Sequence, residues 1–409
     1  MAPTGQGPVQ PLPRGDFNGR MLLVVTTLLV AFGTVAVASA SEGQATANGG
    51  LAWSIMVHDL VYLGFGVVAL YCVARIRLDW LIRRAPALVI VGLGLLLAVR
   101  AVGTSADGGK RWLDLHFIDL QPSELFKLCT VLFIGWLVAY HRDELGRART
   151  LAVLTLPIVI GGALIVVEPD IGTASVVLAI AFVMLAVVGL RPGLLLSIAA
   201  LGGVGFGAYM LAEPYSARRF FSFLHPDQNL LGSGYQLFQS KIGLGAGGLA
   251  GLGLGHSREK WGLLPNPHTD FIFTIIGEEL GLVGTLTVLA LFVWLLLVAM
   301  RIAARSHNES YRVVAVGIAT WLTLEAVINV ASVVGGWAVT GIPLPFFSYG
   351  GTALITELAA VGLLYNIAHD STPSTPVARA RAHRPGEAAR RASVPSRAHH
   401  GERDTRRVR

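Results

Sequence analysis

Asp270 is the residue of this chain with the clearest potential for chemistry. It stands directly before about 30 almost entirely apolar residues, from Phe271 to Met300. A charged side chain at the boundary of a hydrocarbon phase is costly, which makes it a functional candidate. If this boundary faces outward, the matching substrate is amphiphilic, with its tail in lipid and its head beside Asp270. The alternative is that Asp270 caps the helix that follows, as Asp often does.

Several cations belong to segments that we expect on the same face as Asp270. Basic residues there run against the usual excess of Lys and Arg on the cytoplasmic side, and both types bind phosphates through charge-assisted hydrogen bonds. Each one alone is better explained as an ordinary solvated charge, whereas the group as a whole indicates a phosphate or pyrophosphate ligand. The group comprises Lys110, Arg111, Arg218, Arg219, Lys241, Arg258 and Lys260.

Polar residues inside the apolar segments form a second group. Glu124 and Lys127 are three residues apart and can pair on a helix, and Glu325 and Asn329 share a helix face. Such residues should face the bundle interior, one another or a wet cavity, and we expect about half of them to be structural. The group comprises Glu124, Lys127, Glu168, Asp170, Glu278, Glu279, Glu325 and Asn329.

Two segments predict an unusual backbone. Glycines recur at every fourth residue from Gly243 to Gly255, which on a helix would leave a face open to close approach by another helix or a ligand. A flexible glycine-rich loop is the alternative. Further on, Pro345 and the pair Gly350-Gly351 predict irregular backbone. At membrane depth such backbone is tolerated where it lines a cavity or is buried in protein, which indicates a re-entrant loop.

The elements that must position these residues are membrane-spanning helices. The chain has 409 residues, of which 53% are hydrophobic and only 14% are charged, whereas soluble domains carry about 25% charged residues. Apolar runs near the ~20-residue spanning length recur throughout. We therefore predict an all-α polytopic membrane protein with about ten transmembrane helices. They are expected at 21–40, 54–74, 87–104, 121–140, 151–168, 171–190, 193–212, 271–300, 313–334 and 351–368.

The basic residues predict how these helices are oriented. Most of the 32 Lys and Arg residues fall in alternate loops or in the two terminal segments, so the positive-inside rule places both termini in the cytoplasm. Segment 213–270, between the seventh and eighth spans, is then a large extracytoplasmic loop. This orientation depends on a turn at Glu168-Pro169-Asp170, because one long broken helix there would invert everything downstream.

The chain divides into a cytoplasmic segment 1–20, a transmembrane domain 21–369 and a basic tail 370–409. The tail has ten arginines and almost no large apolar residues, so we expect it to be disordered in the cytoplasm. It is either a solvated tail or a polybasic surface for anionic lipid or an acidic partner. Nucleic acid is not expected as a partner, because the tail lacks interleaved aromatics. Cys72 and Cys129 support neither a disulfide framework nor a metal cluster.

Motifs in a fixed order run from about residue 108 to residue 355. They are Gly109-Lys110-Arg111-Trp112-Leu113, Gln121-Pro122-Ser123-Glu124, Glu168-Pro169-Asp170, His268-Thr269-Asp270-Phe271, Gly277-Glu278-Glu279-Leu280-Gly281 and Pro345-Phe346-Phe347-Ser348-Tyr349-Gly350-Gly351. Together they resemble the SEDS family (shape, elongation, division and sporulation). The element Ser257-Arg258-Glu259-Lys260 is more similar to the FtsW and SpoVE branches than to RodA. Asn266 stands where the family commonly has Glu.

The resemblance implies a glycosyltransferase of the bacterial cytoplasmic membrane that polymerises lipid II on the outer face, in cell division or cell-shape maintenance. It implies Asp270 as the general base that accepts the proton of an attacking hydroxyl. Lys110 and Arg218 rank first among the cations near the leaving pyrophosphate, and His268 and Ser348 are further substrate contacts. No cofactor is certain, and a divalent cation, Mg²⁺ or Mn²⁺, is the alternative source of positive charge.

The resemblance also implies protein partners. The main one is a class B penicillin-binding protein, a transpeptidase that crosslinks the glycan product. Division or elongation proteins are further candidates, with the basic tail as their contact.

Two other functions suit the same residues. Buried carboxylates and broken helices also fit a transporter that flips lipid II across the membrane. A scaffold that recruits a transpeptidase, with the basic tail as its handle, is the third hypothesis. Glycan polymer formed by the purified protein would distinguish the enzyme from both.

Overall fold

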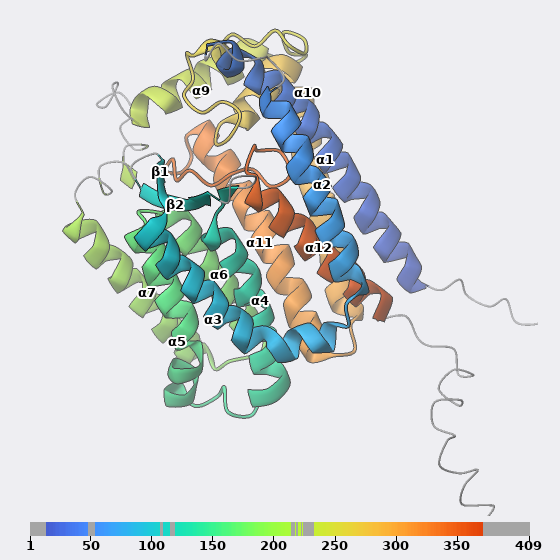
Figure 1. Cartoon of the computed structure of the whole chain (residues 1–409), viewed down its shortest axis with the longest axis vertical. Helices are drawn as coiled ribbons and strands as arrows, with labels where there is room; N and C mark the ends of the chain where they lie inside the picture. Colours follow the sequence, from blue (N-terminus) through green and yellow to red (C-terminus); the bar gives the residue numbers. More distant parts are fainter. Residues whose placement is uncertain are drawn as a thin grey trace, which may run out of the picture. The chain divides into compact units, whose positions relative to one another are not determined.

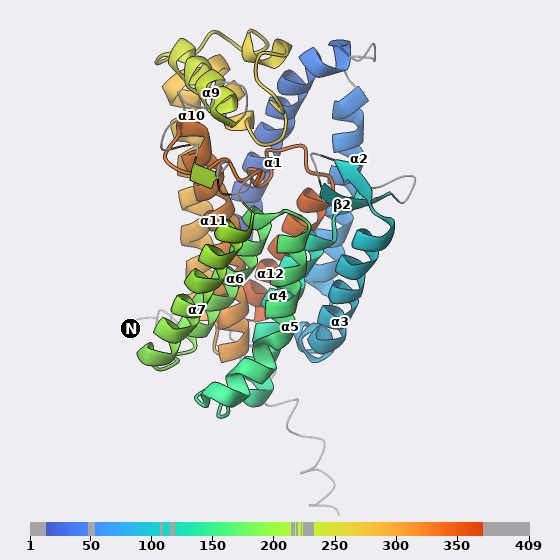
Figure 2. The ribbon, with the colours of Figure 1, turned by 90° about the vertical axis from the view of Figure 1, so that its left-hand side faces the viewer.

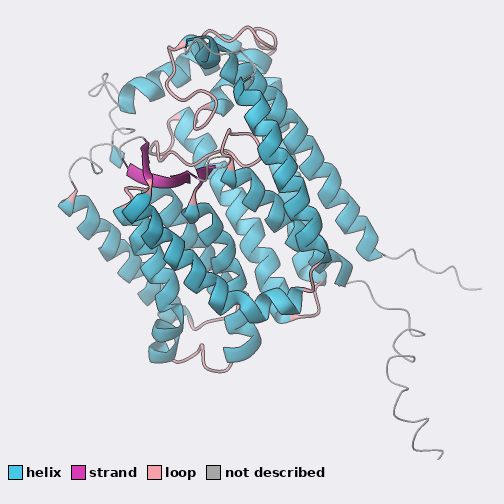
Figure 3. Cartoon of the chain, viewed as in Figure 1, coloured by secondary structure: helices cyan, strands magenta, loops and turns pink. Residues whose placement is uncertain are grey.

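The computed structural model describes residues 14–47, 54–106, 109–114, 119–213, 217, 220–221, 223 and 233–370. These residues form a bundle of long helices with three short strands at its side (Figure 3). Within this part of the chain, nine helices are long and apolar enough to cross a membrane, and Ile171–Val187 is a shorter apolar helix. The prediction of an all-α polytopic membrane fold is confirmed. The predicted tail beyond residue 370 lies outside the described residues.

Each predicted span corresponds to a helix, although the ends differ by up to nine residues. The structure also has a small sheet, which hydropathy did not predict. The sheet is antiparallel with strand order β1-β2-β3. In chain order the elements are α1 (Arg14–Ala47), α2 (Ser54–Arg75), α3 (Leu78–Val102), β1 (Thr104–Ala106), β2 (Gly109–Asp114), β3 (Asp119–Leu120), α4 (Pro122–His141), α5 (Ala148–Val167), α6 (Ile171–Val187), α7 (Pro192–Ala212), α9 (Ser233–Gly247), η2 (Glu259–Trp261), α10 (Ile272–Arg305), α11 (Glu309–Val334) and α12 (Thr352–Asp370).

The start of α3 differs from its prediction by several residues. The helix begins at Leu78 instead of residue 87, and it continues through Pro86. Hydropathy finds the apolar part of a helix, whereas the polar first turns of α3, which include Arg83 and Arg84, extend beyond that part. The two arginines therefore lie on α3 and not in a loop.

The turn between α5 and α6 separates two helices that pack against each other. Asp170 begins α6, because its carboxylate accepts the backbone N–H of Thr173 at 3.1 Å and the Thr173 hydroxyl at 2.9 Å. This is an N-cap, which satisfies a backbone donor that the helix itself leaves unpaired. One long broken helix is excluded here, so the chain reverses at Glu168-Pro169-Asp170 as predicted.

The core of the bundle lies along α4, α11 and α12, whose residues are mostly buried, whereas α7 buries only Met210. α9 and the segment before α10 gather at one end of the bundle (Figure 1). The first described residues of α1 and the last residues of α12 lie toward the other end, as the rotated view also shows (Figure 2). The residues around Asp270 therefore share one end of the bundle with α9.

α10 is interrupted at Gly281, where φ is +64° and ψ is −159°. This backbone favours glycine, and it divides α10 into a half-helix, Ile272–Leu280, and a longer second half. A Cβ atom on Gly281 would lie 2.5 Å from the backbone nitrogen of Gly251. The break therefore allows the loop after α9 to pack directly on the backbone of α10.

The glycines that recur from Gly243 to Gly255 do not share one helix. α9 ends at Gly247, and Gly251 and Gly255 have positive φ in the turns beyond it. The predicted single helix face is wrong after Gly247, because these turns reverse the chain over α10. The predicted close approach is confirmed, since a Cβ on Gly247 would overlap the carbonyl oxygen of Gly277.

Candidate active site

Asp270 lies in a tight turn at the end of the loop that precedes α10. Asn266 adopts a left-handed φ of +53°, which Asn tolerates better than most residues. Its carbonyl oxygen accepts the backbone N–H of Thr269 at 3.3 Å and that of Phe271 at 3.4 Å. The N-cap position of α10 is Phe271, whose side chain makes no cap hydrogen bond. Asp270 stands one residue before this position and is half-buried.

A second loop, residues 341–351, packs against the Asp270 turn and is the irregular segment that the prolines and glycines predicted. The Ser348 hydroxyl donates to the carbonyl oxygen of Thr269 at 2.7 Å and accepts the backbone N–H of Leu344 at 2.8 Å. The backbone N–H of Tyr349 donates to the carbonyl oxygen of His268 at 2.9 Å. Ser348, predicted as a substrate contact, therefore joins the two loops.

The prolines and glycines of this loop have distinct places. Pro345 is buried. Gly350 accepts the backbone N–H of Ala353 at 2.7 Å, at the start of α12. Gly351, with φ at +38°, packs so closely on the ring of Tyr62 that a Cβ there would lie 2.9 Å from it. The loop is thus fixed on both sides of Ser348.

Asn329 of α11 bridges the two loops. Its side-chain amide donates to the carbonyl oxygen of Asp270 at 2.9 Å and to that of Ile342 at 2.8 Å. At the same junction, a Cβ on Gly341 would lie 3.5 Å from Oδ2 of Asp270. Asn329 therefore holds the backbone of Asp270 against the second loop.

Replacing Asn329 by leucine is expected to lower the rate of any reaction that uses Asp270 about 10–100-fold, because a misplacement near 1 Å can cost that much. It also leaves buried carbonyl groups without a donor, which costs about 1–3 kcal/mol of stability each. Asn366 offers a matched control, since its amide makes the same double donation, to Val73 and Ile76, far along α12. Asn366→Leu should lose comparable thermal stability and keep its activity. Equal activity losses in both variants would contradict the bridging role.

His268 is buried next to Tyr349, with their ring centroids 5.8 Å apart. Burial lowers the pKa of His268 to about 4, so its ring is neutral near pH 7. Within the described residues its Nδ1 atom has no hydrogen-bond partner. His268 can thus exchange a hydrogen bond with a ligand, but it offers no positive charge to a phosphate.

The predicted cations occupy three kinds of position. Lys110 on β2, Lys241 on α9 and Arg258 are exposed. Arg111 is engaged by the protein, because its guanidinium donates to the carbonyl oxygens of Glu168 at 3.0 Å and Pro169 at 2.5 Å. Lys260 is completely buried. Arg218 and Arg219 lie outside the described residues.

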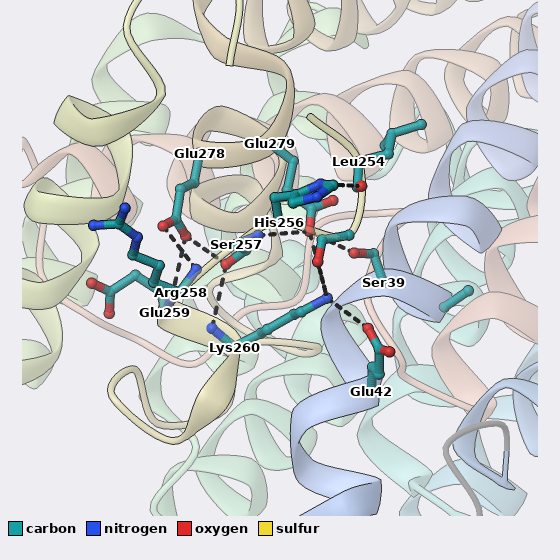
Figure 4. A network of polar contacts seen from close by, with 12 residues as sticks. Ser39, Glu42, Leu254, His256, Ser257, Arg258, Glu259, Lys260, Glu278 and Glu279 are labelled. Atoms are coloured by element: carbon teal, nitrogen blue, oxygen red, sulfur yellow. Dashed lines mark hydrogen bonds and ion pairs between the residues drawn. The ribbon is translucent and has the colours of Figure 1, made fainter. Parts of the chain in front are cut away.

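Lys260 and Glu278 belong to one polar network beneath the loop after α9 (Figure 4). The Glu278 carboxylate accepts the hydroxyl of Ser257 at 2.5 Å and the backbone N–H groups of Arg258 at 2.9 Å and Glu259 at 3.3 Å. Glu278, predicted as a structural residue of the cavity, therefore fixes this loop on the half-helix of α10.

Burial and the neighbouring Glu278 raise the pKa of Glu259 to about 7. Below pH 4.5 the folded and unfolded chains both hold this proton, and between pH 4.5 and 7 the unfolded chain loses it first. Stability should therefore fall as the pH rises through this window. Melting temperatures between pH 5 and pH 8 should decline less for Glu259→Gln than for the wild type. Glu144→Gln is the control, because Glu144 is exposed. A curve of melting temperature against pH for Glu259→Gln that runs parallel to that of the wild type would contradict the raised pKa of Glu259.

The intramembrane residues Glu124 and Lys127 pair as predicted, at 2.8 Å. Lys127 also pairs with Glu325 of α11, whose other oxygen accepts the indole N–H of Trp321 at 2.7 Å. The sequence placed Glu325 with Asn329 and missed this pairing, because the two helices are almost 200 residues apart in the chain. It also missed the buried Glu357, whose carboxylate accepts the backbone N–H of Phe346 at 2.8 Å. The sequence feature that could have indicated Glu357 is an acidic residue inside a predicted span.

A divalent cation would require several oxygen ligands from the protein or the substrate. Within the described part of the chain, no three His, Cys, Asp or Glu side chains converge to hold a metal ion. A divalent cation beside Asp270 would therefore take part of its ligands from the substrate or from water, and the residue roles derived below do not depend on it.

The comparison with known proteins agrees with this geometry. A family model described as "Cell cycle protein" (FTSW_RODA_SPOVE) matches residues 19–373. The stage V sporulation protein E of Bacillus subtilis (strain 168) is 36% identical over 355 residues, which cover 86% of this chain and 97% of that protein. The "Probable peptidoglycan glycosyltransferase FtsW" of Methylococcus capsulatus is 37% identical over 360 residues, which cover 87% of this chain and 90% of that protein.

Two solved structures share the fold. One is a peptidoglycan synthase complex ("Structural coordination of polymerization and crosslinking by a peptidoglycan synthase complex"), with a TM-score of 0.71 and 28% identity over 86% of this chain and 98% of that chain. The other is the rod shape determining protein RodA of Thermus thermophilus, with a TM-score of 0.62 and 27% identity over 86% of this chain and 97% of that chain. The family model covers most of the chain, and the relatives are matched over nearly their whole length. The chain therefore belongs to the FtsW/RodA/SpoVE family, the SEDS family.

Proposed function

We propose that this chain is a peptidoglycan glycosyltransferase that polymerises lipid II at the outer face of the bacterial cytoplasmic membrane, in cell division or cell-shape maintenance. The observation that carries the proposal is the half-buried Asp270 carboxylate at the start of an apolar helix. Asn329 holds the backbone carbonyl of Asp270, and main-chain hydrogen bonds join the neighbouring residues of the two loops. Relatives named as probable peptidoglycan glycosyltransferases support the proposal.

In the proposed reaction Asp270 acts as the general base. A sugar hydroxyl attacks the anomeric carbon and passes its proton to the carboxylate, which contributes typically about 10²–10⁴-fold to the rate. The new glycosidic bond forms as the bond from that carbon to the pyrophosphate oxygen breaks, and the pyrophosphate leaves with the electron pair. Lys110, Lys241 and Arg258 are the exposed, described cations of the predicted group that can stabilise this charge, and Arg218 and Arg219 remain candidates.

The remaining assignments belong to the same proposal. Both termini are cytoplasmic and segment 213–270 is extracytoplasmic, as the basic residues of the sequence favour. The solved peptidoglycan synthase complex supports a class B penicillin-binding protein as the partner. The basic tail beyond residue 370 is a further contact for division or elongation proteins.

The reaction of purified protein and its partner with lipid II tests the proposed function. Glycan polymer supports the enzyme, and its absence under conditions where a known polymerase is active contradicts the proposal. Translocation of lipid II in vesicles without polymer would favour the flippase instead, which the buried Glu124–Lys127–Glu325 group would also suit. Reporters fused after residues 190 and 260 test the orientation, and a cytoplasmic signal at 260 would place Asp270 on the wrong side.

A further inference from the structure

α1 is remote in sequence from every motif of the site, yet it contacts both outer segments that hold Asp270. Small residues line the face of α1 that makes these contacts, because Gly33, Ala36, Ala40 and Gly43 fall on one side of the helix. A Cβ on Gly33 would overlap the carbonyl oxygen of Phe346, in the loop that Ser348 joins to Thr269. A Cβ on Gly43 would overlap the carbonyl oxygen of Lys260. The backbone of α1 therefore supports two segments of the site directly.

Polar side chains of α1 lie beside this face and reach the half-helix of α10 (Figure 4). The Ser39 hydroxyl donates to Oε1 of Glu279 at 2.6 Å, and the backbone N–H of Ser257 donates to the same oxygen at 3.3 Å. Lys260 Nζ lies 3.9 Å from that oxygen and pairs with Glu42 of α1 at 2.7 Å. One carboxylate of α10 thus joins α1, the loop after α9 and η2.

The central charged groups of this network are buried. The Lys260 side chain is 0% exposed and that of Glu279 is 3% exposed, whereas Glu42 is 46% exposed. A buried charge is stable only with its partners in place. Lys260 also donates to the carbonyl oxygen of Gly255 at 2.8 Å. The ion pair and these hydrogen bonds therefore define one relative position of α1, the loop and α10.

The half-helix that this network holds is the one that follows Asp270. Glu279 lies in its last turn, about 10 Å along the axis from Ile272 at 1.5 Å per residue. In its first turn the Thr274 hydroxyl contacts Ser240 of α9 at 2.6 Å, and Ser240 donates to the carbonyl oxygen of Val333 at 2.8 Å. Because α10 breaks at Gly281, these contacts position the half-helix independently of the second half.

We propose that α1 is a brace for the catalytic base, and that Ser39, Lys260 and Glu279 are positioning residues that set the place of Asp270. Lys260 then acts through the half-helix and does not contact the substrate pyrophosphate. This inference rests on the proposed function of Asp270. It requires that a disturbed brace lowers the turnover number, kcat, and leaves the binding of lipid II unchanged.

A methyl group on the inner face of α1 tests the brace. Gly43→Ala is expected to lower kcat about 10–100-fold, because the displaced loop misplaces the base, while KM for lipid II changes less than about twofold. Gly64→Ala on α2 is the matched control, since its Cβ meets nothing within 4 Å, and its kcat should equal that of the wild type. An unchanged kcat for a folded Gly43→Ala protein would overturn the proposal.

A second pair of variants decides the matter if Gly43→Ala fails to fold. Glu279→Gln keeps an oxygen for Ser39 and Ser257, whereas Glu279→Ala removes it. The glutamine variant is expected to retain most of the wild-type kcat, and the alanine variant to lose about tenfold or more. Equal kcat values for the two variants would overturn the bracing role.

A double-mutant cycle separates positioning from a general loss of structure. Asp270→Glu already misplaces the base, so adding Glu279→Ala to it should lower kcat far less than in the wild type. Additive effects would overturn the proposal. If Asp270→Asn polymerises normally, the proposed role of Asp270 as the base fails, and the brace fails with it. If Asp270→Asn is inactive while Glu279→Ala keeps the wild-type kcat, only the brace fails.

Discussion

Replacing Asp270 by asparagine is expected to reduce the rate of glycan polymerisation by about 10²–10⁴-fold. Asparagine has nearly the same shape as aspartate, but it accepts no proton at neutral pH. The backbone of residue 270 is held through its carbonyl oxygen by Asn329, so the loop should keep its position in the variant. The measurement is the initial rate of polymer formation from lipid II by the purified complex.

Two controls make this result specific to the base. Binding of lipid II should be retained in Asp270→Asn, because the exposed Lys110 and Lys241, which we propose as contacts of the pyrophosphate, are unchanged. Asp270→Glu keeps the carboxylate but moves it by one methylene, so its rate should fall by about 10²-fold or less and remain above that of the asparagine variant. A polymerisation rate for Asp270→Asn close to the wild type would remove Asp270 from the mechanism.

Replacing Lys127 by methionine is expected to destabilise the bundle by about 3–5 kcal/mol, because the change leaves buried carboxylates without a cation. Lys127 pairs with both Glu124 and Glu325, and its ammonium also lies 5.0 Å from the ring centre of Trp321. Thermal unfolding in detergent measures the loss. The structure predicts that little folded protein survives purification.

Charge balance explains this expectation and provides its control. Adding Glu124→Gln and Glu325→Gln to Lys127→Met should recover much of the lost stability, since no unpaired charge then remains in the core. Arg142→Met breaks a half-exposed pair with Glu309, at 3.1 Å, and should cost less than about 1 kcal/mol. Equal losses for Lys127→Met and Arg142→Met would contradict the buried network.

Hydropathy and motif order were enough to predict much of this protein. Apolar runs located the helices because lipid demands nearly the same length of apolar chain from every span. The Asp270 turn and the Ser348 loop were each recognised as unusual, the first by its charge and the second by its prolines and glycines. That the two loops meet followed from neither pattern, because the hydrogen bonds that join them are accepted by backbone carbonyl groups.

The position of Lys260 shows why the rest could not be predicted. A lysine in a polar loop is usually solvated, so the sequence placed it among the cations for a phosphate. It is buried because Glu42 and Glu279 converge on it from helices far apart in the chain. Gly33 and Gly43 gave no signal for a similar reason, since a glycine in an apolar helix does not reveal which neighbour touches its backbone.

At the junction beside the base, the hydrogen bonds between the two loops involve main-chain groups of His268, Thr269 and Tyr349. Beyond the Ser348 and Asn329 side chains, such a junction depends on the length of the chain. One inserted residue between Asn266 and Asp270 shifts every later carbonyl by about 3.3–3.6 Å, which is the whole length of a hydrogen bond. We therefore expect homologous enzymes to keep the number of residues between the positions of Asn266 and Asp270 fixed, even where the residue types in that segment differ.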